Sequence, residues 1–213
     1  MNAAVIYVHG LWLSGHEAFM LRRRLEKERG YAWQAFGYTS SLQTMAEIAD
    51  ALHETIAALD APAVHLVGHS LGGLAILRCL ERHPQQPPGR AVFLGTPCLA
   101  SRTANALARF RFGRAMLGKA ATEELLYTHE RAWRSGRELG IIAGNQPFSL
   151  GRLVTDFDEP NDGTVAVSET RLPGATAHLV LPVSHSGMLL SARVAHEVGQ
   201  FLDSGRFGAP PPA

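Results

Sequence analysis

One short motif in this sequence, Gly68-His69-Ser70-Leu71-Gly72, carries a side chain suited to covalent catalysis. It follows a short apolar run and precedes a segment of helical period, which is the setting that a nucleophile elbow requires. A serine in such a turn takes a strained backbone conformation, and only small residues fit two positions to either side. We therefore predict that Ser70 is a nucleophile and that Gly68, His69 and Gly72 form the elbow.

A serine hydroxyl is a poor nucleophile at neutral pH and needs a histidine to accept its proton. In known proteins whose nucleophile lies on an elbow of this form, an acid and then the histidine follow the serine in the chain. His185 comes after the last predicted strand and before the last predicted helix, on a loop that could face Ser70. We predict His185 as the base, with His196, inside the last predicted helix, as its rival.

A carboxylate must orient that histidine. The acidic candidates that follow the predicted strand at 139–143 are Asp156, Asp158, Glu159 and Asp162. Their spacing alone does not choose among them. The free amides at the start of the helix after Ser70 favour an anion, so the Leu71 amide is predicted to stabilise an oxyanion.

Two segments resemble bacterial lipases and related serine esterases of the α/β-hydrolase superfamily. Asn161-Asp162-Gly163-Thr164-Val165 is similar to the N-D-G-x-V segment that carries the triad aspartate, which implies Asp162 as the acid. Val8-His9-Gly10-Leu11 is similar to the H-G segment whose next residue supplies the second oxyanion amide, which implies Leu11. Taken singly, the first segment is equally consistent with a simple turn, and the second with a strand-to-helix turn holding a buried histidine.

A third segment, Leu94-Gly95-Thr96-Pro97, is similar to the L-G-T-P segment of the same family. The family often continues with histidine, whereas this chain has Cys98. The departure leaves the predicted triad unchanged, but the substrate preference of the true lipases is not carried over.

Short apolar runs alternate with segments of helical period, a pattern typical of a mostly parallel sheet with helices on both faces. The resemblance implies the α/β-hydrolase fold, as one domain over residues 1–213. The predicted strands are 5–8, 33–38, 64–67, 91–94, 139–143 and 178–183, and the predicted helices are 16–29, 42–59, 71–83 and 191–202.

The segment 99–138 is too long for an ordinary connection in such a sheet, and we expect it to form a helical lid insertion. Its first part, 99–122, contains no acidic residue. Apolar residues are interleaved there with five basic ones, which are Arg102, Arg109, Arg111, Arg114 and Lys119. One hypothesis is a lid whose apolar side covers an acyl group while its arginines meet phosphate, carboxylate or an anionic membrane surface. The alternative is an ordinary solvated face packed on the domain.

The overall composition excludes several classes of protein. The formal net charge of +1 offers no field for nucleic acid, and no apolar stretch reaches the roughly 18 residues of a membrane span. The two cysteines have no metal-ligand spacing, so we expect reduced, structural thiols. An apolar strand pattern begins at Val5 and leaves no room for a signal peptide before it, so we expect a cytoplasmic protein.

These observations favour a serine hydrolase that cleaves carboxylic esters, including lipid-like ones, through an acyl-enzyme. A thioesterase or amidase with the same triad is the alternative, and a non-catalytic binding protein on the same scaffold is a third. The predicted chemistry requires no metal or organic cofactor, and the sequence leaves a bound calcium, the oligomeric state and the acyl length undecided.

Overall fold

A computed structural model describes residues 3–99, 101–108, 113–126, 131–147 and 157–208. Its strands are β1 (Ala4–Val8), β2 (Ala32–Phe36), β3 (Val64–His69), β4 (Ala91–Leu94), β5 (Leu139–Gly144) and β6 (Ala177–Leu181). Its α-helices are α1 (Phe19–Arg29), α2 (Met45–Ala57), α3 (Leu71–Arg82), α4 (Arg102–Ala108), α5 (Gly113–Leu125) and α6 (Ala192–Ser204). Short 3-10 turns are η1 (His16–Ala18), η3 (Ser168–Thr170) and η4 (Gly187–Leu189).

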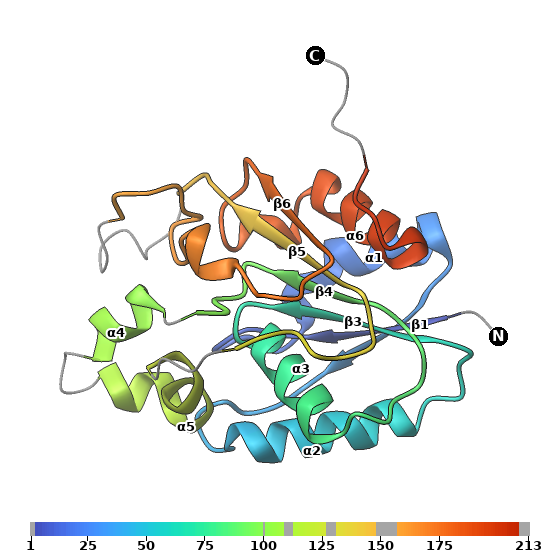
Figure 1. Ribbon diagram of the computed structural model, residues 1–213, viewed down its shortest axis with the longest axis horizontal. Coiled ribbons are helices and arrows are strands. Elements are labelled where there is room, and N and C mark those ends of the chain that lie inside the picture. Colours follow the sequence, from blue (N-terminus) through green and yellow to red (C-terminus); the bar gives the residue numbers. More distant parts are fainter. Residues whose placement is uncertain (1–2, 100, 109–112, 127–130, 148–156, 209–213) are drawn as a thin grey trace.

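The six strands form one parallel sheet in the order β2-β1-β3-β4-β5-β6. Helices α1 and α6 cover one face, and α2 and α3 cover the other (Figure 1). The predicted parallel sheet with helices on both faces is confirmed, and each predicted strand and helix is present with ends that shift by a few residues.

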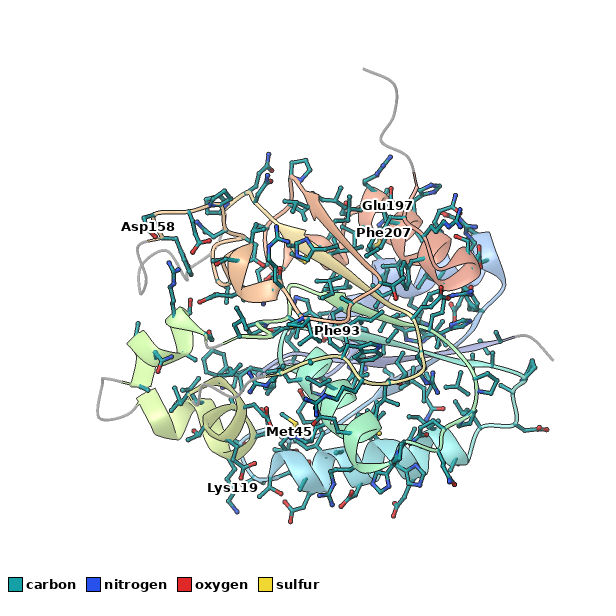
Figure 2. The ribbon with its side chains drawn as sticks, in the orientation of Figure 1. Met45, Phe93, Lys119, Asp158, Glu197 and Phe207 are labelled. Atoms are coloured by element: carbon teal, nitrogen blue, oxygen red, sulfur yellow. The ribbon has the colours of Figure 1, made fainter. Side chains whose placement is uncertain are left out.

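Alternation along the strands divides the core into two layers. In β1, Ile6 and Val8 face the α2 and α3 side, whereas Val5 and Tyr7 face the α1 and α6 side, as the two-residue period of a strand requires. Phe93 lies at the centre of the molecule, while Lys119 and Asp158 lie at its edge (Figure 2).

Helix α2 begins at Met45, three residues later than predicted, because Thr44 caps it. The Thr44 hydroxyl accepts a hydrogen bond from the Glu47 amide, and the Glu47 carboxylate accepts one from the Thr44 amide. This capping box satisfies two amides that would otherwise lack acceptors. It ends the preceding loop at a defined residue.

The inserted segment lies beyond the carboxyl ends of the strands, where α4 and α5 stand beside the sheet (Figure 1). A partly buried ion triad links α5 to the rest of the molecule: the Glu124 carboxylate contacts the guanidinium of Arg78 on α3 at 2.7 Å and that of Arg131 at 2.8 Å. Arg131 also donates to the Cys98 carbonyl at 3.1 Å. Of the basic residues predicted on a lid surface, Arg109 and Arg111 lie outside the described residues, as does the side chain of Arg114.

We expect the α2 layer to be sensitive to loss of apolar volume. Leu52 is 0% exposed on α2, so Leu52→Ala should lower the free energy of unfolding by about 2–5 kcal/mol through lost burial and a cavity. Leu42→Ala is the matched control, because Leu42 is 71% exposed and its loss should change stability by less than about 0.5 kcal/mol. Urea unfolding of both variants measures the difference, and equal losses would contradict the packing described here.

Candidate active site

Ser70 lies in the turn between β3 and α3 with φ 54° and ψ −123°, a backbone conformation that side-chain-bearing residues rarely adopt. The neighbouring glycines make the turn sterically feasible. A Cβ at Gly68 would lie 2.6 Å from the Gly73 backbone, and one at Gly72 would lie 2.6 Å from the His9 carbonyl oxygen. The first turn of α3 therefore packs directly on the end of β1.

His185 follows β6 and forms a hydrogen bond through Nδ1 with Asp162 Oδ2 at 2.7 Å. Both residues are buried, with Asp162 1% and His185 8% exposed. The other carboxylate oxygen of Asp162 accepts from the Thr164 amide at 2.9 Å and the Val165 amide at 2.7 Å. The carboxylate orients the ring so that Nδ1 carries the proton, and Nε2 is left to accept one.

The other candidates from the sequence have different surroundings. Asp158 and Glu159 pair with the Arg102 guanidinium at the surface, at 3.2 and 2.5 Å. His196 lies on the exposed side of α6, and Asp156 lies outside the described residues. Among the described candidates, the structure brings Asp162 alone to His185.

His69, within the elbow, links the Ser70 turn to the histidine loop. Its Nε2 lies 3.1 Å from the His185 carbonyl oxygen, and its ring packs 4.7 Å from the His185 ring, centroid to centroid. Burial lowers the pKa of His69 to about 3, so the ring is neutral at physiological pH and donates from Nε2. The His69 side chain therefore holds the His185 loop against the Ser70 turn. The sequence predicted His69 as part of the elbow but did not predict this contact.

The two predicted oxyanion amides lie on segments that meet at Ser70. Leu71 is the first residue of α3, and a Cβ on Gly10, immediately before Leu11, would lie 3.1 Å from the Ser70 Cβ. Outside the regular elements, the backbone hydrogen bonds among the described residues include none donated by either amide. Beneath them, the His9 ring stacks on Tyr38 at 4.2 Å and 7°, and the Tyr38 hydroxyl donates to the His9 carbonyl at 2.8 Å.

A cavity of about 360 Å³ opens between these groups and the inserted helices. Ser70 and His185 are among its lining residues, and α4 and α5 contribute Ala104, Leu117 and Leu125. The described residues that line it include no Lys, Arg, Asp or Glu. The cavity is therefore suited to an uncharged, largely apolar group.

A larger cavity of about 810 Å³ lies away from Ser70 and His185. It is lined by polar groups such as Arg90 and Arg137, which are held by Glu138 and by the Val64 carbonyl. Although this cavity is larger, we do not assign it as the active site, because none of the predicted catalytic residues lines it.

Gly95 is a site residue that sequence reasoning missed, although its segment had been noted. Its φ is +55°, and a Cβ there would lie 3.0 Å from both Asp162 Oδ2 and His185 Nδ1. The only available signal was the family-like L-G-T-P segment, which does not show what the glycine faces.

No group of three His, Cys, Asp or Glu side chains within the described ranges could hold a metal ion. Both cysteines are unbridged and buried, and burial raises the pKa of each thiol to about 12. No described helix combines the length and apolar character needed to cross a bilayer.

Gly95→Ala should lower kcat/KM at this site by about 100-fold, because the added methyl group displaces Asp162 or His185 from their hydrogen bond. Gly136→Ala is the control, since a Cβ there meets nothing within 4 Å. Steady-state kinetics on both variants, with thermal unfolding to exclude gross destabilisation, measures the effect. Wild-type kinetics for Gly95→Ala would contradict the close approach.

Comparisons with known proteins place the chain in a family. No curated protein sequence matches it. Its structure is similar to the mature lipase of Bacillus licheniformis, with TM-score 0.76, 20% identity and coverage of 95% of this chain and 91% of that one; the longer propeptide form is covered to 52%. It is also similar to a carboxylesterase of Bacillus subtilis, with TM-score 0.61, 14% identity and coverage of 97% and 85%.

A thioesterase from the prodiginine pathway of Streptomyces coelicolor is similar as well, with TM-score 0.60, 14% identity and coverage of 93% and 85%. At these identities the likeness shows the fold alone. The model of the alpha/beta hydrolase family matches residues 5–195. Because that match spans most of the sequence, the chain belongs to the alpha/beta hydrolase family.

Proposed function

We propose that this protein is a serine esterase for carboxylic esters whose acyl group is uncharged and largely apolar. The observation that carries the proposal is the buried hydrogen bond between His185 and Asp162, beside a cavity that both Ser70 and His185 line. Family membership makes hydrolysis the expected reaction. The cavity lining supports the class of substrate.

In the proposed mechanism, His185 Nε2 takes the Ser70 hydroxyl proton as the oxygen attacks the ester carbonyl carbon. The carbonyl oxygen becomes an oxyanion that accepts hydrogen bonds from the Leu11 and Leu71 amides. His185 then gives the proton to the departing alkoxide, which leaves as an alcohol, and Ser70 remains acylated. Water, deprotonated by His185, then attacks the acyl carbon; the bond from that carbon to Ser70 Oγ breaks, the acid leaves, and His185 returns the proton to Ser70 Oγ.

Asp162 stays ionised through this cycle. It holds the His185 ring in orientation and stabilises the imidazolium that forms when the ring takes the proton. The two amides that it accepts keep its carboxylate in place.

Apolar residues of α4 and α5 form the roof of the proposed acyl site. Because Glu124 anchors α5 to Arg78 and Arg131, we propose that the insertion seats the acyl group as a fixed roof. Contact with a membrane through 99–122 and a cytoplasmic location stay predictions.

Ser70→Ala should abolish labelling by a fluorophosphonate and lower kcat for a p-nitrophenyl ester at least about a thousand-fold, because the nucleophile is lost. Ser186→Ala is the matched control for labelling, since Ser186 lines the same cavity and is not the proposed nucleophile. Gel fluorescence and steady-state kinetics measure the two effects. Labelling that survives Ser70→Ala would overturn the proposal.

An acyl chain that ends in a carboxylate should be a poor substrate. With no cationic side chain among the described lining residues to pair with it, the carboxylate must be desolvated without compensation. We expect kcat/KM for the mono-p-nitrophenyl ester of adipic acid to be at least about tenfold below that for p-nitrophenyl hexanoate. Equal values would contradict an apolar acyl site.

The same hexanoyl group offered as a thioester and as an anilide tests the bond that is cleaved. The proposal expects the ester to have the highest kcat/KM once each uncatalysed rate is subtracted. A faster thioester would make the protein a thioesterase and leave the Ser70 assignment standing.

A further inference from the structure

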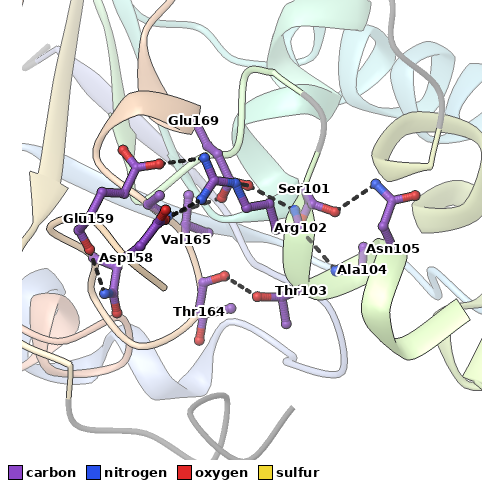
Figure 3. A network of polar contacts seen from close by, with 12 residues as sticks. Ser101, Arg102, Thr103, Ala104, Asn105, Asp158, Glu159, Thr164, Val165 and Glu169 are labelled. Atoms are coloured by element: carbon purple, nitrogen blue, oxygen red, sulfur yellow. Dashed lines mark hydrogen bonds and ion pairs between the residues drawn. The ribbon is translucent and has the colours of Figure 1, made fainter. Parts of the chain in front are cut away.

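Glu169 is a buried acidic residue that the proposed chemistry does not use. It lies in η3, is 4% exposed, and each of its carboxylate oxygens accepts a backbone hydrogen bond. Oε2 accepts from the Ala166 amide at 3.0 Å, and Oε1 accepts from the Arg102 amide at 2.8 Å. One carboxylate therefore joins two segments far apart in the chain (Figure 3).

The first of these segments is the turn that carries Asp162. Ala166 pairs with Asn161 in an isolated antiparallel bridge, and the Asp162 amide donates to the Val165 carbonyl at 3.1 Å. The Glu169 carboxylate closes this turn from the outside, through Ala166. The Glu169 carboxylate therefore contacts the end of the turn that carries Asp162.

The second segment is the start of α4. Arg102 is its first residue, and the Arg102 guanidinium reaches back to Asp158 and Glu159, which precede the Asp162 turn. The Thr103 hydroxyl donates to the Thr164 carbonyl at 2.6 Å. Figure 3 shows the contacts of Arg102 with the two carboxylates and that of Thr103 with Thr164. The start of α4 thus contacts the Asp162 turn directly through Thr103 and indirectly through the Glu169 carboxylate.

The electrostatic setting of Glu169 fits this bridging role. Burial raises the pKa of Glu169, while the Ala166 and Arg102 amides and the Arg102 charge oppose that rise. The two amides donate to different carboxylate oxygens, so a glutamine side chain in the same position would present its oxygen to one amide and its NH₂ group to the other.

We propose that Glu169 is a positioning residue for the ester hydrolysis: its carboxylate holds the turn of Asp162 against the start of α4, so that Asp162 meets His185. The inference rests on the proposed function, because the position of Asp162 affects the rate only if Asp162 acts through His185. Glu169 acts through Asp162 and does not touch the substrate.

Glu169→Gln is the decisive variant, since its NH₂ group must face one of the two backbone amides. We expect kcat per fluorophosphonate-titrated site to fall about 10- to 100-fold, with KM changed by less than about threefold. Glu159→Gln is the matched control, because Glu159 also pairs with Arg102 but accepts neither of these two amides. It should keep wild-type kcat.

Proton NMR supplies a readout that a merely structural role would not move. The hydrogen-bonded Nδ1 proton of His185 should give a low-field resonance, assigned by its loss in Asp162→Asn. In Glu169→Gln that resonance should weaken or shift, and in Glu159→Gln it should not. In the kinetic measurement, kcat is expressed per fluorophosphonate-titrated site, so unfolded protein does not contribute to the change in kcat.

Glu169→Asp provides the test if the glutamine variant does not fold. It keeps the charge but is one methylene shorter, so it can reach only one amide well, and its kcat should lie between those of wild type and Glu169→Gln. Wild-type kcat and an unmoved resonance in a folded Glu169 variant, or a loss confined to KM, would overturn the positioning role.

Failure of the proposed function has a different signature. In that case either the wild-type protein would not hydrolyse the ester or Ser70→Ala would still hydrolyse it, whatever Glu169→Gln does. Failure of the positioning role alone would leave Ser70→Ala inactive and Glu169→Gln at the wild-type rate.

Discussion

The close backbone contact between the first turn of α3 and the end of β1 is the constraint on which the site depends. A Cβ at Gly72 would overlap the Val8 and His9 carbonyls, and one at Gly73 would overlap the Thr96 side chain. Because glycine has no Cβ, the helix can start directly on the sheet at these positions. Ser70, in the short turn between the two, takes its strained conformation. The same contact brings the Gly10 backbone beside Ser70 and so determines where an oxyanion could be held.

Around the Ser70 turn, hydrogen bonds of buried polar groups hold the side chains of the proposed site in place. Asp162 is 1% exposed, and each of its oxygens has a partner, while His69 donates to the His185 carbonyl from a fully buried position. An unpaired buried polar group costs about 1–3 kcal/mol, so these contacts resist rearrangement. The loops that carry Asp162 and His185 are thus held by hydrogen bonds of buried side chains, whereas the strands beneath them are held by the backbone hydrogen bonds of the sheet and by apolar packing.

Much of this arrangement could be predicted from the sequence, because local patterns encode it. The apolar run before Ser70, the glycines around it and the helical period after it all act within a few residues. Choosing Asp162 over Asp158 and Glu159 needed a resemblance, because which carboxylate turns inward depends on Arg102, more than fifty positions earlier in the chain. Gly95 could not be recognised at all, since its role arises only where two distant loops meet.

The ion triad of Arg78, Glu124 and Arg131, in which Glu124 and Arg131 are buried, has a consequence for exchanging the inserted helices between related proteins. Glu124 belongs to the insertion, Arg78 belongs to the central scaffold, and Arg131 lies in the chain that returns to the sheet. A chimera that received residues 101–126 alone would bury Glu124 without its cations, at a cost of about 3–5 kcal/mol. The segment that must be transferred together is therefore larger than the part that covers the cavity. It includes Arg78 on α3, a helix outside the insertion.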